Sequence, residues 1–179
     1  MEKQQKSLES FTWEKFKSLQ NNPDIFKNYY NYFFALSNWI KQNPDVVDYD
    51  MLSIYRLNKL LNIDVKLYLT EQPEISLISE PKRMFSRKPE TVESLVMRIG
   101  DTLWDLVKRR SGKDCPNCKD DELNYVIAES IATEEKEIIL ECDSCGWTEK
   151  KDGSKWVGGL ANIFPINKEE AKLESIVFK

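Results

Sequence analysis

The chain has 179 residues and a formal net charge of −4, and 41% of its residues are hydrophobic and 31% charged. This composition excludes wholesale disorder and is typical of a globular protein with a substantial core. The sequence contains no histidine, which excludes His-based catalytic triads and mixed Cys/His zinc sites. No stretch approaches the ~20 apolar residues of a transmembrane helix and the first residues carry no apolar signal-peptide core, so we expect a cytoplasmic protein.

Three helices are predicted in the first part of the chain. Residues 7–20 place apolar side chains at helical spacing and end before Asn22-Pro23, which stops a helix. A second helix begins at Pro23-Asp24 and continues to Asn43-Pro44, and a third follows up to Leu61.

The second helix is the most aromatic segment of the protein. An aromatic stripe of this kind is more typical of a core than of a base-stacking surface. Tyr32 and Trp39 fall off its main apolar face. We therefore expect these two side chains to be exposed and to anchor a partner.

The pattern changes after the third helix. Residues 65–69 and 75–78 alternate as half-buried strands do, which predicts a small β-hairpin over 65–78. Residues 80–89 are bounded by prolines and indicate an exposed basic loop that contains Arg83 and Arg87. A fourth amphipathic helix is predicted over residues 90–110, with Ser111-Gly112 as its stop and Arg109 and Arg110 in its last turn.

The four cysteines of the chain form two Cys-x-x-Cys pairs. Cys115 and Cys118 are separated by 23 residues from Cys142 and Cys145. The residues between the pairs contain two β-rich stretches, 123–128 and 137–140, joined by a polar connection, and such a hairpin would bring the pairs together. Four thiolates in a tetrahedron are the ligands of a structural Zn²⁺ site.

Residues 115–157 resemble a zinc ribbon of the rubredoxin-knuckle type. Cys145-Gly146 follows the pattern of that family, while Lys119 stands where the first knuckle commonly has glycine. The resemblance implies a closed Cys₄ site with no open position for water, so hydrolytic zinc catalysis is not expected. No Gly-rich phosphate loop is present either, and we expect a protein that is not an enzyme.

The distribution of charge bears on the partner. Residues 114–158 carry 5 basic and 12 acidic side chains, a net charge of −7, whereas residues 81–113 carry 9 basic and 4 acidic side chains. An acidic ribbon repels phosphates and suits a basic protein partner, for which an immunity protein that neutralises a nuclease toxin is one example. The candidate contact residues are Tyr32, Trp39, Asp120, Asp121, Glu122, Glu134 and Glu135.

Two alternatives for the basic segment remain open. It could face the acidic ribbon within the molecule, or a regulatory factor could contact nucleic acid through residues 82–113, above all through Arg83, Arg87, Arg109 and Arg110. The fold expected from all these patterns is α+β. A mainly helical domain with a small hairpin covers residues 1–112, a Cys₄ zinc ribbon covers 113–158, and a tail of residues 159–179 packs back on the body.

Overall fold

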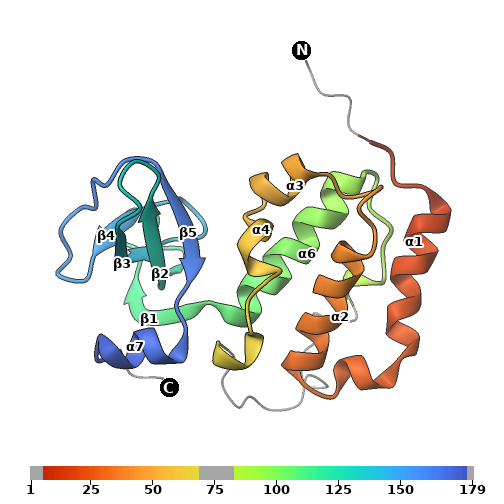
Figure 1. Cartoon of the computed structure of the whole chain (residues 1–179), viewed down its shortest axis with the longest axis horizontal. Coiled ribbons are helices and arrows are strands. Elements are labelled where there is room, and N and C mark those ends of the chain that lie inside the picture. Colours follow the sequence, from red (N-terminus) through yellow and green to blue (C-terminus); the bar gives the residue numbers. More distant parts are fainter. Residues whose placement is uncertain (1–5, 69–82, 177–179) are drawn as a thin grey trace. The chain divides into compact units, whose positions relative to one another are not determined.

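A computed structural model describes residues 6–68 and 83–176 (Figure 1). Helices precede a five-stranded antiparallel sheet, which confirms the α+β class. The chain divides into two compact units, Met1–Leu106 and Val107–Lys179. The division therefore falls before the expected boundary at residue 112. Within the described ranges, no helix has the length and apolarity that crossing a bilayer requires.

The first unit contains short helices and one long one. Their bounds are α1 Ser10–Lys17, η1 Ser18–Asn21, η2 Pro23–Phe26, α2 Tyr29–Lys41, α3 Tyr49–Ile54, α4 Leu57–Leu60, η3 Val65–Leu67 and α6 Val92–Val107, where η marks a 3₁₀ helix. Several of these helices begin at an N-cap residue whose side chain accepts a backbone N–H of the first turn. Asn28 accepts the backbone N–H of Asn31 at the start of α2, and Asp48 accepts that of Met51 at the start of α3.

Phe16 of α1 lies at the centre of an aromatic cluster in this unit. Its ring is fully buried, and its centroid lies 5.0 Å from that of Trp39 and 5.0 Å from that of Phe85. Helix α6 is amphipathic, as predicted: Val92, Leu95, Val96, Ile99 and Leu103 are buried, and Leu106 is half-buried.

Two predictions for this unit are wrong in part. The third helix is broken into α3 and α4 because Arg56 adopts a left-handed backbone conformation with φ of 55°. Val65–Leu67 forms a 3₁₀ helix instead of the first strand of a hairpin, started by Asp64, whose carboxylate accepts the backbone N–H of Lys66. The remainder of the expected hairpin, residues 69–78, lies outside the described residues.

Tyr32 and Trp39 are buried, which corrects their expected exposure. They are 2% and 3% exposed, and the Tyr32 hydroxyl lies 3.6 Å from the sulfur of Met84. The buried stripe of α2 runs through Tyr32, Phe33, Leu36, Trp39 and Ile40, while Phe34 is 53% exposed. The side of α2 that is buried, which packs against Phe16 of α1, therefore differs from the apolar side that the sequence pattern indicates.

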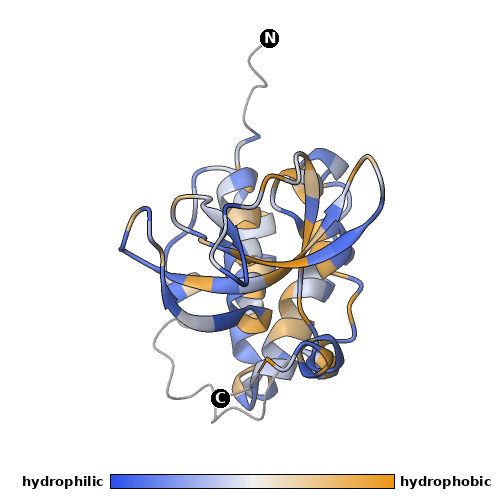
Figure 2. Ribbon diagram, turned by 90° about the vertical axis from the view of Figure 1, so that its left-hand side faces the viewer, coloured by the Kyte–Doolittle hydropathy of each residue, from blue (hydrophilic) through white to orange (hydrophobic). Residues whose placement is uncertain are grey.

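The second unit is built on the sheet. Its strands are β1 Arg109–Asp114, β2 Glu122–Ser130, β3 Lys136–Glu141, β4 Thr148–Lys150 and β5 Ala161–Pro165, and helix α7 Lys168–Leu173 follows. The order β1-β2-β3-β4 is antiparallel throughout, and β5 pairs with β2 beyond the end of β1. Apolar residues concentrate on the central part of the strands, and the outer loops are mostly polar (Figure 2).

The strands confirm the predicted hairpin between the cysteine pairs and correct its surroundings. The predicted fourth helix ends at Val107, and Arg109 and Arg110 belong to β1. Within the predicted tail of residues 159–179, residues 161–165 form a strand of the same sheet by pairing with β2. Asp152-Gly153 forms the turn after β4, with Gly153 at φ of 86° and the Lys150 N–H donating to the Ser154 carbonyl at 2.8 Å.

Candidate metal centre

Two backbone turns of the same design hold the four cysteines. Cys115 and Cys118 lie in the turn between β1 and β2, and Cys142 and Cys145 lie in the turn between β3 and β4. In the first turn, the N–H of Lys119 donates to the carbonyl of Cys115 at 3.0 Å. In the second, the N–H of Gly146 donates to the carbonyl of Cys142 at 2.9 Å. The antiparallel pairing of β2 with β3 brings the two turns to the same end of the hairpin.

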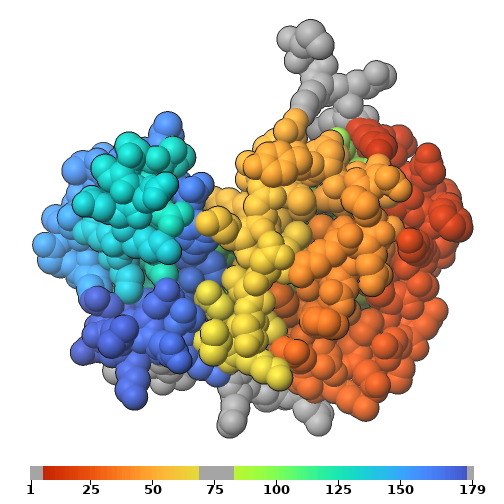
Figure 3. All heavy atoms as spheres, viewed as in Figure 1, coloured from red at the N-terminus to blue at the C-terminus, as the bar shows by residue number. Residues whose placement is uncertain are grey.

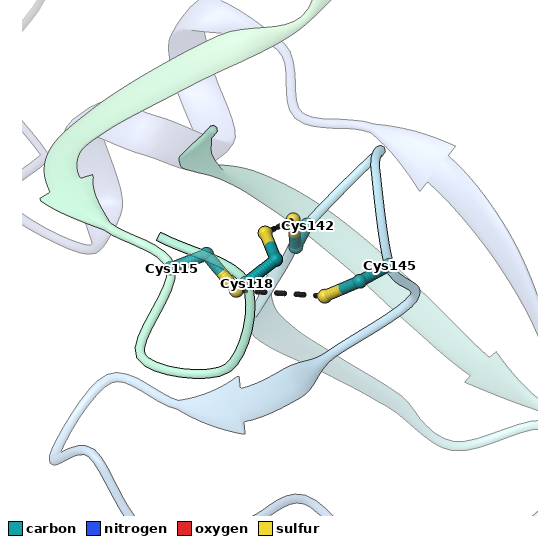
Figure 4. A group of neighbouring side chains, drawn as sticks. All are labelled: Cys115, Cys118, Cys142 and Cys145. Atoms are coloured by element: carbon teal, nitrogen blue, oxygen red, sulfur yellow. Dashed lines mark hydrogen bonds between the residues drawn. The ribbon is translucent and has the colours of Figure 1, made fainter. Parts of the chain in front are cut away.

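The four sulfur atoms converge on one point (Figure 4). Cys115 Sγ lies 3.6 Å from Cys145 Sγ, and Cys118 Sγ lies 3.6 Å from Cys142 Sγ, while all four lie within 4.8 Å of one another. A disulfide would need about 2.05 Å, so all four side chains are free cysteines. Four sulfurs about 2.3 Å from a tetrahedral Zn²⁺ would be about 3.8 Å apart, which the spacing here matches closely.

The four cysteines differ in how apolar their surroundings are. Cys115 and Cys142 are buried in a cluster with Leu123 and Leu140, and Cys145 is exposed. Burial raises the pKa of the Cys142 thiol to about 12. A hydrogen bond from the Asn117 side chain, followed by one from the Trp147 backbone N–H, lowers the pKa of Cys145 to about 6.

Polar contacts also tie the two cysteine turns together. Ser144 donates its hydroxyl to the Asp121 carboxylate at 3.0 Å, which joins the two turns directly. Asp143 accepts from Asn124 at 3.0 Å and pairs with Lys108 at 3.0 Å. Groups of this kind orient metal ligands and make a site rigid. The sequence analysis did not identify Asn117 as a donor to Cys145 or Ser144 as a link between the two turns. Both residues lie inside a Cys-x-x-Cys pair, and this position could have indicated that they lie beside the sulfur atoms.

Most cations of the predicted basic segment that belong to this unit contact acidic groups of the same unit. Arg110 lies 3.9 Å from the Glu122 carboxylate, and Lys113 pairs with the buried Glu149. Lys108 pairs with Asp143, as noted above. The intramolecular alternative therefore holds for these three side chains.

The remaining candidate contact residues are dispersed. Asp120 is exposed beside the first cysteine turn, whereas Glu134 and Glu135 are exposed in the turn between β2 and β3, so the structure does not bring them into one site. Arg83 and Arg87 are exposed in the first unit, and Arg109 is half-buried in the second.

A scan against protein families, a search of curated proteins and a search of solved structures each find no significant match to this chain. The cluster of four cysteines is compatible with a zinc ribbon and can hold a metal ion such as zinc.

Proposed function

We propose that this protein is a zinc-ribbon protein in which Cys115, Cys118, Cys142 and Cys145 hold a structural Zn²⁺. The matching backbone turns and the 3.6 Å sulfur separations support this assignment. Thiolate ligands favour zinc or iron, and a closed tetrahedral set of four suits a structural ion. With all four positions taken by sulfur, the ion would have no position for a substrate or water, so its role is to fold the ribbon.

We further propose that the protein is not an enzyme and that its ribbon binds a basic protein. The observation that carries this proposal is the pairing of cations in the second unit. Lys108, Arg110 and Lys113 contact carboxylates of the same unit, whereas Asp114, Asp120, Glu134 and Glu135 have no ion-pair partner among the described residues. Zn²⁺ bound by four thiolates would add a charge of about −2 to this surface.

A surface of this charge accelerates and orients the approach of a basic partner. Nucleases are basic where they hold phosphates, so a nuclease toxin is a partner of suitable chemistry. The specific function that we propose is therefore neutralisation of such a toxin, by an immunity protein acting in the cytoplasm.

A charge-reversal experiment with the zinc-loaded full-length protein tests this proposal. The protein is used to capture partners from a lysate at rising salt, and the captured material is identified as protein or nucleic acid. Reversing all four unpaired carboxylates together, with Asp114→Lys, Asp120→Lys, Glu134→Lys and Glu135→Lys, should abolish capture of a basic protein and leave the metal content unchanged. Recovery of RNA or DNA without any protein partner would overturn the proposal.

The alternative function, contact with nucleic acid, rests on the exposure of Arg83 and Arg87 in the first unit. It predicts salt-sensitive binding to a nucleic acid that is lost when Arg83 and Arg87 are changed to glutamate. Arg110 offers less for this function, because it already contacts Glu122. The same lysate capture distinguishes the two functions, since each predicts a different class of bound molecule.

A further inference from the structure

Two large apolar side chains lie side by side at the end of the sheet opposite the two cysteine turns. Ile131 is 59% exposed and Leu160 is 82% exposed. The backbone N–H of Ile131 donates to the carbonyl of Leu160 at 3.1 Å, which extends the β2–β5 ladder one pair beyond Ser130 and Ala161. Residues directly opposite each other in an antiparallel ladder place their side chains on the same face. Ile131 and Leu160 therefore form one exposed apolar pair.

The turn that follows Ile131 gives this pair an acidic border. Residues 131–135, which we call the fingertip, connect β2 to β3. Glu134 and Glu135 are exposed there and have no cation partner among the described residues. On the same face, Glu129 is already paired with Lys136 at 3.4 Å. The uncompensated charge beside the apolar pair is thus that of Glu134 and Glu135.

The backbone around the pair is held in place by short-range contacts. The N–H of Glu134 donates to the carbonyl of Ser130 at 2.9 Å, and that of Ser130 donates to the carbonyl of Glu135 at 2.9 Å. On the other strand, the Trp156 ring packs so closely on Gly158 that a Cβ there would lie 2.2 Å from it. The Trp156 ring itself packs on the sheet and donates its N–H to the Glu137 carboxylate at 3.0 Å. A surface ordered in advance loses less entropy when a partner binds.

We propose that Ile131 and Leu160, with Glu134 and Glu135, form the docking surface for a basic amphipathic segment of the partner. This inference rests on the proposed binding of a basic protein and adds the place and the chemistry of contact. Exposed apolar side chains bordered by polar groups are typical of protein interaction sites. The two carboxylates select lysine and arginine over acidic side chains at the border, so the complementary segment combines aliphatic and basic residues.

The unit also offers an internal control. Leu173 of α7 is 86% exposed, so its side chain is as accessible as that of Leu160. Figure 1 shows α7 at the opposite end of the second unit from the β2–β3 turn, and Figure 3 shows the residues of that turn (teal) on the surface. Leu173→Ser therefore removes exposed apolar area without touching the fingertip.

The probes are two synthetic peptides of equal length and charge, one of lysine and leucine in an amphipathic helical pattern and one of lysine and serine. Their affinities for the zinc-loaded full-length protein are measured by fluorescence anisotropy. We expect the leucine-containing peptide to bind at least about tenfold more tightly, because only that peptide covers the apolar pair. Ile131→Ser and Leu160→Ser should each remove most of this advantage, and Leu173→Ser should not.

Charge reversal separates this inference from the proposed function. Glu134→Lys with Glu135→Lys is compared with Asp114→Lys with Asp120→Lys, which changes the charge by the same amount beside the metal centre. If only the Glu134/Glu135 variant loses binding, docking at the fingertip is supported. If only the Asp114/Asp120 variant loses binding, docking at the fingertip is overturned, while the proposed binding of a basic protein is retained. If neither peptide binds the unaltered protein, both proposals are overturned. Metal content is measured for every variant to show that the ribbon is intact.

Discussion

Lys119 and Gly146 occupy equivalent positions in the two cysteine turns. Each follows the second cysteine of its pair, and their φ angles are 61° and 69°. Each donates its backbone N–H to the carbonyl of the first cysteine, at 3.0 Å and 2.9 Å. The left-handed conformation costs a non-glycine residue about 1–2 kcal/mol. The first turn therefore carries a strain that the second avoids.

This difference predicts opposite effects of substitution at the two positions. Lys119→Gly should raise the free energy of unfolding by about 0.5–1 kcal/mol, since the relief of strain exceeds the added entropy of the unfolded chain. Gly146→Ala should lower it by about 1 kcal/mol. A Cβ at Gly146 meets nothing within 4 Å, so the cost is conformational and not steric. Denaturant unfolding of the zinc-loaded variants measures both changes, and a stabilising Gly146→Ala would contradict this account.

Removal of the metal should unfold the ribbon. The Cys₄ site joins two turns that the sheet alone must otherwise hold, and the binding free energy of structural zinc is on the order of 10 kcal/mol at neutral pH. Cys142→Ser should abolish stoichiometric zinc binding, because a buried ligand is lost.

Hydrogen exchange measures the consequence of that change. Amide protection should collapse in strands β2 and β3, between Glu122 and Glu141, and should persist in α6 if the first unit is stable by its own core. Ser144→Ala is the control, since it removes the hydroxyl bond to Asp121 and retains all four ligands. Full protection of β2 and β3 in the metal-free protein would show that zinc is not structural.

Zinc binding should weaken as the pH falls. A cysteine in an unfolded chain has a pKa of about 8.5, so its thiol is mostly protonated at neutral pH. Because the metal-free ribbon is unfolded, its thiols must release protons when zinc binds and the ribbon folds. Protons compete with zinc for the sulfur, so each released proton reduces the apparent affinity by about tenfold per pH unit of acidification.

Calorimetry in buffers of different ionisation enthalpy counts the released protons. In the folded ribbon, the hydrogen bond from Asn117 lowers the pKa of Cys145 to about 6 and so favours its thiolate. Asn117→Ala should therefore weaken zinc binding in the same titration, and Asn162→Ala, at an exposed position of β5, should leave the affinity unchanged. Equal zinc affinity in all three proteins would refute the role of Asn117.

The sequence predicts the metal ligands well because the chemistry requires a fixed spacing. Cys115 and Cys142 are each followed by a second cysteine three residues later, and this spacing can be recognised without knowing how the chain packs. The buried face of α6 is predicted equally well, since its apolar side chains from Val92 to Leu103 form one continuous stripe and only one side of the helix can face the core.

The remaining features depend on neighbours that the local sequence does not reveal. Arg109–Asp114 has no strand-forming residues, and it becomes β1 by pairing with β2. The start of the predicted hairpin at Val65 was ambiguous because short apolar runs suit either kind of structure. Trp39 was misjudged because contact with Phe16, which is distant in the sequence, decides which face of α2 is covered.

The aromatic cluster of the first unit gives the last prediction. Phe16 is fully buried and contacts Trp13, Trp39 and Phe85, whereas Phe11 on the same helix is 79% exposed. Phe16→Ala should lower the free energy of unfolding by about 3–5 kcal/mol, because it leaves a cavity among three rings. Phe11→Ala changes the same side chain in α1 and should cost no more than about 0.5 kcal/mol. Thermal unfolding followed by helical circular dichroism compares the two, and equal destabilisation would show that Phe16 does not lie at the centre of this core.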